Sequence, residues 1–100
     1  MRFKILYSTS FFEDLQQNID WYNDKQTGLG VRFYKAVKRR LVEIKRNPYS
    51  VAIRYDDVRC ACVKKFPYMI HFRVLLDDKI IEAIAVFSTH RNPEMWKSLN

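Results

Sequence analysis

The sequence has few glycines and prolines, and it lacks any long apolar run. Two glycines and three prolines among 100 residues leave little material for a flexible linker, so we expect a single domain spanning residues 1–100. No apolar segment approaches the roughly 18 residues that a membrane-spanning helix needs. The first seven residues are too short and too soon polar for a secretory signal. These absences favour a cytoplasmic protein that makes no membrane contact.

Cysteine is also scarce, with only Cys60 and Cys62 in the chain. Residues two apart on a strand point to the same side, which gives poor geometry for a disulfide. A metal site would need more ligands, and no Cys/His cluster lies nearby in the sequence. We therefore expect two small buried or half-buried thiols, and no metal or cofactor.

What the chain has in excess is positive charge. It carries a formal net charge of +7. Residues 29–46 hold seven basic side chains against Glu43 alone, a balance of +6, whereas residues 1–28 balance at −1 and residues 47–100 at +2. Such an excess implies an acidic partner, either nucleic acid or an acidic protein segment. The alternative is a solvated helix face that only keeps the protein in solution.

The N-terminal third predicts a short strand followed by a helix. Apolar and polar residues alternate over residues 3–7, as in a strand. Ser8-Thr9-Ser10 offers helix caps, and Ser10 with Glu13 three residues later fits a capping box. One apolar stripe then follows at spacings of three and four, formed by Phe12, Leu15, Ile19 and Tyr22.

A second helix is predicted from about Leu29 to Arg46. Its buried stripe would consist of Leu29, Phe33, Ala36, Val37, Leu41 and Ile44, with basic side chains on the opposite side. Asn47 and Pro48 end it, because proline disfavours helical geometry in the residue before it. Two helices joined by a short loop should form an antiparallel hairpin.

The remainder of the chain predicts three strands. β-rich runs separated by turn signals cover residues 58–65, 68–76 and 79–88, and Asp77-Asp78 fits a two-residue hairpin loop. Paired residue numbers would then sum to 155, which places Arg73 opposite Glu82 and His71 opposite Ile84. One face of the middle strand would meet the helices with Ile70, Phe72, Val74 and Leu76. The other face would point outward with Met69, His71, Arg73 and Leu75.

These elements define an α+β fold in the order β-α-α-β-β-β. The helical hairpin packs on one face of a small, mostly antiparallel sheet. A short C-terminal turn or helix begins at Pro93 and carries Trp96, which either docks onto the sheet or projects as a contact. Phe66-Pro67-Tyr68 reads as a turn entering a strand, with its aromatic rings in the core.

Several short motifs resemble the RelE/ParE superfamily, the toxin half of bacterial type II toxin–antitoxin pairs. The resemblance covers nearly the whole chain through the order and spacing of its motifs. They are Tyr7-Ser8, Trp21-Tyr22, Leu29-Gly30 with Phe33, Ile44 to Pro48, Val58-Arg59, Phe66-Pro67-Tyr68 with Ile70 and Phe72, and His90-Arg91-Asn92-Pro93 with Trp96. It implies the fold just described.

The superfamily has two known activities, and this chain departs from one of them. RelE-like members cleave messenger RNA in the ribosomal A site, whereas ParE-like members inhibit DNA gyrase and are not nucleases. RelE supplies lysines on the second main strand, an arginine after the tyrosine that opens the third, and an arginine and a tyrosine near the end. Here the lysine positions fall near Cys60 and Cys62, the first arginine becomes Met69, and the final tyrosine is matched by Trp96. Only Arg91 is retained.

A different nuclease site remains an alternative. RNA cleavage needs a group that activates the ribose 2′-hydroxyl and cations that stabilise the phosphorane. His90, Arg91 and Arg73 with Lys64 and Lys65 would supply an acid/base group and a phosphate clamp. The competing interpretation is that Arg73 pairs with Glu82 and the two lysines only decorate a hairpin.

The resemblance thus implies a ParE-like toxin that inhibits growth by binding DNA gyrase rather than by turnover, in modules associated with plasmid stabilisation. The alternatives are a ribosome-dependent mRNA endonuclease and a non-toxic member that only binds antitoxin. The implied partners are a cognate acidic antitoxin and either gyrase or the ribosome with its mRNA, and operator DNA would be reached only through the antitoxin. Candidate contact residues for target or antitoxin are Arg59, His71, Trp96, Lys35, Lys38 and Arg39.

Overall fold

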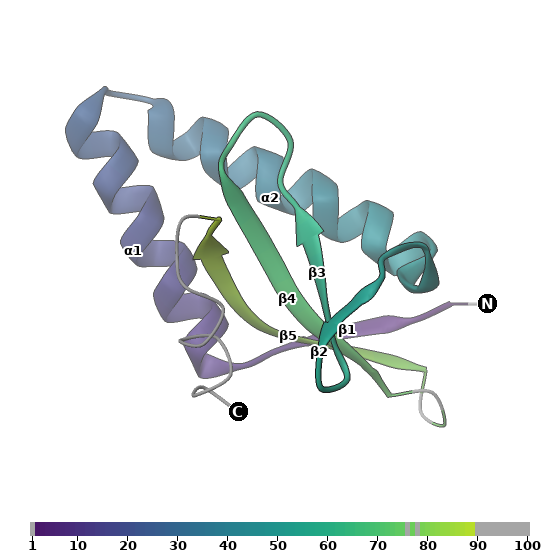
Figure 1. The fold of residues 1–100 in the computed structure, drawn as a ribbon. Helices are drawn as coiled ribbons and strands as arrows, with labels where there is room; N and C mark the ends of the chain where they lie inside the picture. The colour runs from purple at the N-terminus through teal and green to yellow at the C-terminus, as the bar shows by residue number, and fades with distance from the viewer. Residues whose placement is uncertain (1, 76, 78, 90–100) are drawn as a thin grey trace.

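Two helices lie on one face of a five-stranded sheet (Figure 1). The computed structural model describes residues 2–75, 77 and 79–89. The elements in chain order are β1 (Lys4–Tyr7), α1 (Thr9–Lys25), α2 (Leu29–Arg46), the 3₁₀ turn η1 (Pro48–Ser50), β2 (Ile53–Tyr55), β3 (Val58–Cys62), β4 (Tyr68–Leu75) and β5 (Ile80–Ser88). Neither described helix is long and apolar enough to cross a membrane. The expected turn or helix from Pro93 lies outside the described residues.

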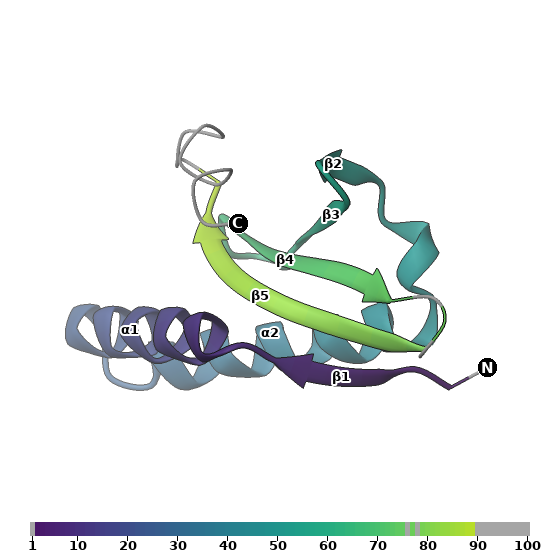
Figure 2. The ribbon, with the colours of Figure 1, turned by 90° about the horizontal axis from the view of Figure 1, so that it is seen from below.

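The sheet has the strand order β1-β5-β4-β3-β2. β1 pairs in parallel with β5, and every other neighbouring pair is antiparallel. Figure 2 shows both helices on one side of the sheet and β2 curling away from them on the other. The α+β class and the helical hairpin are therefore confirmed. The sequence missed β2, because a three-residue strand leaves no readable alternation.

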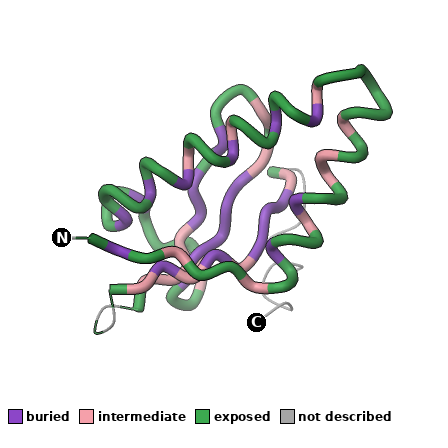
Figure 3. The backbone as a smooth tube through the Cα atoms, turned by 180° about the vertical axis from the view of Figure 1, so that it is seen from behind, coloured by how far each residue is buried: buried purple, intermediate pink, exposed green. Residues whose placement is uncertain are grey.

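The main core lies between α2 and the sheet. Phe33, Val37, Leu41 and Ile44 are buried at spacings of four, four and three residues, as an amphipathic helix requires. On the sheet side Ile70 and Phe72 are fully buried, with Val74 packed against the same cluster. Figure 3 shows this buried backbone running through the central strands and along the facing side of α2. The predicted bounds of α2 are confirmed, and so is the helix-facing side of β4 for Ile70, Phe72 and Val74, while Leu76 lies outside the described residues.

The start of α1 differs from the prediction. Ser8, not Ser10, is the N-cap, and its Oγ accepts a hydrogen bond from the Phe11 amide at 3.0 Å. The same Oγ donates to the carbonyl of Ile84 on β5 at 3.0 Å, so the cap also ties α1 to the sheet. Phe11 is consequently in the core at 1% exposure, while Phe12 is 54% exposed. The predicted capping box and the place of Phe12 in the buried stripe are wrong.

A bulge in β5 shifts half of the β4–β5 register. Arg73 pairs with Glu82 as predicted, but His71 pairs with Ala85 instead of Ile84. Ile84 is the extra residue, because the next pair after His71–Ala85 is Phe72–Ala83. The bulge leaves the Ile84 carbonyl available to the Ser8 hydroxyl.

α1 and α2 approach each other closely where α2 begins. A Cβ added at Gly30 would lie 2.3 Å from the Ile19 carbonyl oxygen and 2.6 Å from the Asn23 side chain. The Gly30 amide donates instead to Asn23 Oδ1 at 2.8 Å. Only glycine therefore allows the two helices to meet at this point.

Candidate functional site

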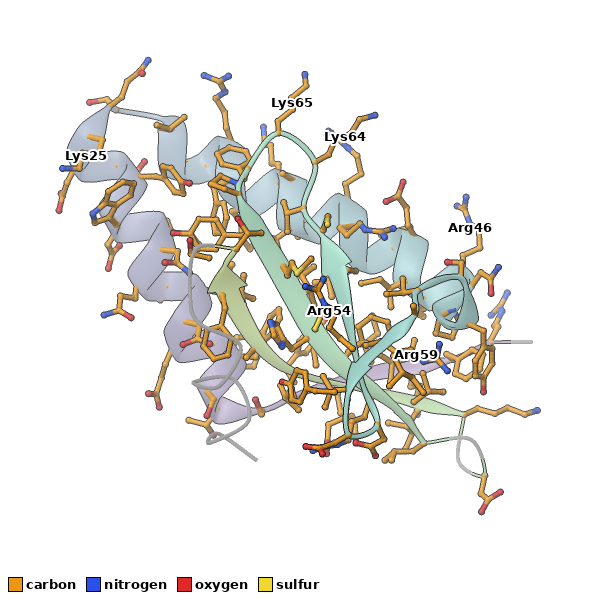
Figure 4. All side chains as sticks on the ribbon, in the orientation of Figure 1. Lys25, Arg46, Arg54, Arg59, Lys64 and Lys65 are labelled. Carbon is orange, nitrogen blue, oxygen red and sulfur yellow. The ribbon has the colours of Figure 1, made fainter. Side chains whose placement is uncertain are left out.

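A cationic cleft runs between α2 and the loop that joins β3 to β4. It has a volume of about 390 Å³, and we define it by the residues that line it: Leu29, Arg32, Lys35, Ala36, Arg39, Lys64, Lys65 and Phe66. α2 forms one wall, and the loop carries Lys64 and Lys65 on the other. Figure 4 shows both lysines projecting outward from the loop beside α2. The structure thus brings together two sets of basic residues that the sequence places in different candidate sites.

The loop is held against α2 by its aromatic residue. The ring of Phe66 lies 5.2 Å from that of Phe33 and 5.3 Å from that of Tyr22, centre to centre. Tyr68 packs on Phe33 at 5.0 Å, and its hydroxyl donates to Asn18. The predicted core role of Phe66-Pro67-Tyr68 is therefore confirmed for both aromatic rings.

The five cations of the cleft lack the ion pairs that two other basic residues of the described chain form. Arg40 pairs with Glu43 at 3.2 Å, and Arg73 pairs with Asp57 at 2.7 Å and with Glu82 at 3.5 Å. None of the described carboxylates forms an ion pair with a cation of the cleft. Like charges gathered without acidic neighbours create a positive potential that attracts anions.

Arg73 lies far from the two lysines with which the nuclease alternative combines it. It stands opposite Glu82 toward the end of β4, while the β3–β4 loop precedes Tyr68 at the start of that strand. Five residues of strand separate Tyr68 from Arg73, about 17 Å. The hydrogen bond that Arg73 donates to Asp57 raises the pKa of Arg73 and lowers the pKa of Asp57. The predicted pairing of Arg73 with Glu82 is confirmed, and His90 and Arg91 lie outside the described residues.

The sheet face away from the helices carries a second apolar cluster. We call it the outer cluster; its buried members are Val58, Cys60, Met69, Ala85 and Phe87, with Tyr55 and Ile84 partly buried against them. β2 curls over this face, and Arg54 reaches from it toward Met69, with 4.0 Å between Nη1 and the sulfur (Figure 4). The face is not open, as the sequence suggested, but largely covered.

His71 lies on the face away from the helices, as predicted, but it is fully buried there and not exposed. Its Nδ1 lies 3.0 Å from the Tyr55 hydroxyl and 3.4 Å from the Cys60 sulfur. Burial, and then the charge of Arg54, lower the pKa of His71 from 6.5 to about 4. Burial likewise raises the pKa of Cys60 to about 11. This His/Cys pair is therefore a neutral imidazole beside a protonated thiol, with neither a base nor a nucleophile poised near neutral pH.

The cysteines do not share one environment. Cys60 is buried, Cys62 is exposed, and both are free thiols. The expected pair of small buried or half-buried thiols thus holds for Cys60 alone. Within the described part of the chain, no three His, Cys, Asp or Glu side chains are grouped to hold a metal ion.

The remaining predicted contact residues are spread over other surfaces. The Arg59 guanidinium lies 5.2 Å from the Tyr49 ring and donates to the Val51 carbonyl, so it braces η1 against β3. The Lys38 ammonium lies 5.5 Å from the Tyr34 ring, on a different side of α2 from the cationic cleft. Trp96 lies outside the described residues.

A second groove separates β1 from α2. It has a volume of about 230 Å³ and is lined by Ile5, Tyr7, Lys38, Leu41, Val42 and Lys45. Tyr7 and Val42 are 41% and 55% exposed, and Tyr34 beside Lys38 is 39% exposed. This surface was not predicted from the sequence, although apolar residues outside the buried stripe of α2 indicate it.

Comparison with known proteins gives a family match and several structural neighbours. A family model described as "ParE toxin of type II toxin-antitoxin system, parDE" matches residues 5–93. No curated protein matches the chain. The fold is similar to a chain of the chromosomal ParDE TA system from P. aeruginosa, with a TM-score of 0.75 at 15% identity, over 87% of this chain and 96% of that one.

Two further neighbours come from E. coli. A mutant of the toxin RelE in the free state gives a TM-score of 0.72 at 15% identity, over 97% of this chain and 93% of that one. A chain of the intact RelBE toxin–antitoxin complex gives 0.64 at 16% identity, over 89% and 99%. At these identities the structural likeness shows a shared fold and no more.

Proposed function

Because the chain belongs to the ParE toxin family of type II toxin–antitoxin systems, we propose that it inhibits growth by binding a target protein, DNA gyrase, and not by cleaving RNA. One observation carries this proposal. The outward face of the central strands is an apolar cluster around Cys60 and Met69, where an RNA-cleaving relative needs cations.

The titratable groups near that face support the same proposal. The one described histidine, His71, has no exposed surface and a pKa of about 4, so it cannot exchange protons with a bound ribose near neutral pH. Arg73 already forms ion pairs with two carboxylates, those of Asp57 and Glu82. General acid–base catalysis needs a group with a pKa near the working pH that can reach its substrate.

The test separates binding from turnover. The purified chain should abolish supercoiling by gyrase, and primer extension on total RNA after induction should show no codon-linked cuts. Codon-linked cuts with supercoiling intact would establish the endonuclease alternative, and the double substitution His90→Ala, Arg91→Ala should then abolish them. Absence of growth arrest together with retained antitoxin binding would identify a non-toxic member.

A cognate acidic antitoxin is proposed to occupy the groove between β1 and α2. The neighbours from P. aeruginosa and E. coli come from a ParDE system and a RelBE toxin–antitoxin complex. The groove offers exposed apolar side chains, Tyr7 and Val42, beside the cations Lys38 and Lys45. An acidic amphipathic segment fits this combination, because its apolar side chains would be buried while its carboxylates meet the lysines.

Co-expression with the antitoxin tests this surface. Val42→Glu with Lys38→Glu should abolish co-purification, since the change adds charge to the apolar floor and reverses the lysine. Lys64→Glu with Lys65→Gln makes the same change in charge outside the groove and should leave co-purification intact. Equal loss in both variants would contradict the proposed position of the antitoxin.

A further inference from the structure

We propose that the cationic cleft binds the phosphodiester backbone of a nucleic acid strand through Arg32, Lys35, Arg39, Lys64 and Lys65. This goes beyond gyrase binding and antitoxin binding. It gives the toxin its own nucleic-acid contact, whereas the family resemblance places DNA contact in the antitoxin alone.

The charge of the cleft is the first argument. Its five cations come from two segments that are 25 residues apart in sequence, Arg39 on α2 and Lys64 on the loop, yet they line one cavity. Gathering like charges is unfavourable, and these side chains gain no ion pair with a described carboxylate in compensation. A bound polyanion would remove that repulsion.

The dimensions of the cleft agree with a nucleic acid strand. Arg32, Lys35 and Arg39 follow one another along α2 over seven residues, which is about 10 Å of helix. Phosphates in one strand of a B-form duplex advance about 3.4 Å along its axis, so this wall spans about three of them. The lysines of the loop form the opposite wall, and a strand lying in the cleft would meet cations on both sides.

The β3–β4 loop is held in place before any ligand binds. Lys65 has a left-handed backbone with φ of +70°, which sharpens the turn. The loop closes on itself through bonds from the Val63 amide to the Tyr68 carbonyl at 2.9 Å and from the Tyr68 amide to the Phe66 carbonyl at 2.8 Å. Binding therefore orders little backbone, and the main cost is in the lysine side chains.

The lining of the cleft argues against an extended acidic peptide. A peptide that binds in extended form gains affinity from main-chain bonds to a free strand edge. Here the lining comes from α2 and from residues 64–66 of the loop, which belong to no strand. The cleft thus offers side-chain cations but no strand edge, which suits a phosphate backbone. Phe66 adds an aromatic ring to the lining of the cleft. Grooves that bind single strands commonly combine aromatic rings with basic residues.

The experiment measures binding of the purified full chain to fluorescein-labelled 12-nucleotide DNA and RNA of mixed sequence, single-stranded and duplex, by fluorescence anisotropy at several salt concentrations. If each of five cations meets one phosphate of a single strand, log K should fall with log[salt] with a slope of about −3.5. The affinity would then drop about 130-fold between 50 and 200 mM salt. In Lys64→Gln, Lys65→Gln the slope should shrink to about −2.1, and the drop to about 20-fold.

The matched control is Lys4→Gln with Lys79→Gln. It removes the same charge at the opposite end of the sheet, and Lys79 shares the left-handed backbone of Lys65, with φ of +54°. Its salt slope should equal that of the unmodified chain. Urea unfolding checks that all three proteins are folded.

Three results would overturn the proposal. One is an equal loss of slope in the control, which would mean diffuse charge attraction. Another is the absence of binding at 50 mM salt. The third is competition by poly-L-glutamate as strong as that of the oligonucleotide at equal charge concentration, which would mark a site for acidic protein. The preference between the DNA and RNA probes identifies which phosphodiester backbone the cleft holds.

Discussion

The burial of His71 predicts a specific loss of stability in acid. The folded chain holds the pKa of this imidazole at about 4, whereas the unfolded chain returns it to about 6.5. As the pH falls from 6.5 to 4, the imidazole binds a proton in the unfolded state but not in the native state. The contribution of neutral His71 to stability is therefore fully present above pH 6.5. Below that pH the free energy of unfolding falls by up to 1.36 kcal/mol per pH unit, about 3 kcal/mol over the whole window. That is a large share of the 5–15 kcal/mol typical of a domain.

The variant His71→Gln isolates this effect. Glutamine does not titrate, and its amide keeps a hydrogen-bonding group near the Tyr55 hydroxyl, which now lies 3.0 Å from Nδ1. Urea unfolding at a series of pH values should show that the unmodified chain loses about 2 kcal/mol more than the variant between pH 7.0 and 4.5. All other titrating groups cancel in this difference. Parallel pH curves for the two proteins would refute the reasoning, because they would mean that His71 takes up its proton equally in both states.

Three further perturbations test the fold and its thiols. Gly30→Ala should lower the free energy of unfolding by about 3 kcal/mol, because the added methyl group overlaps α1. Gly28→Asn is the control and should change it little, because asparagine tolerates the left-handed backbone. Equal melting temperatures of both variants and the unmodified chain would contradict this close contact. Ser8→Ala should cost about 1 kcal/mol in urea unfolding through loss of the cap and its bond to β5, and an unchanged midpoint would mean that the cap contributes nothing. Iodoacetamide at pH 8 should modify Cys62 and leave Cys60 intact in the native chain, because burial raises the pKa of Cys60 to about 11. Peptide mass spectrometry measures the labelling, and equal rates for both thiols would contradict the burial of Cys60.

The elements with strong local signals are readable from the sequence. α2 is predicted at its observed bounds because its apolar spacing is regular and Asn47-Pro48 stops it. The start of α1 is not, because Ser8 and Ser10 are equally good caps locally. The choice is made by the Ile84 carbonyl, 76 residues away from Ser8, which only the folded sheet brings near. The bulge at Ile84 is hidden for the same reason, since the hairpin turn alone predicts an uninterrupted register.

Only part of the candidate site could be predicted from the sequence. Basic residues on α2 are plain in the sequence, and so is the Lys64-Lys65 pair. Their meeting in one cleft is not, because it depends on Phe66 packing against Phe33 and Tyr22. The burial of His71 could not be predicted from the sequence either, because part of its cover comes from β2, a strand too short to recognise.

The central place of β5 determines when a growing chain can complete this fold. β5 lies between β1 and β4, so the first strand made has no neighbour in the sheet until nearly the last described residues have been synthesised. Until then the apolar stripe of α2 lacks Ile81, Ala83 and Val86 as partners. Contacts of such long sequence separation close late and slowly. A nascent chain that stops before Ile80 would therefore expose its helical hairpin to chaperones and proteases.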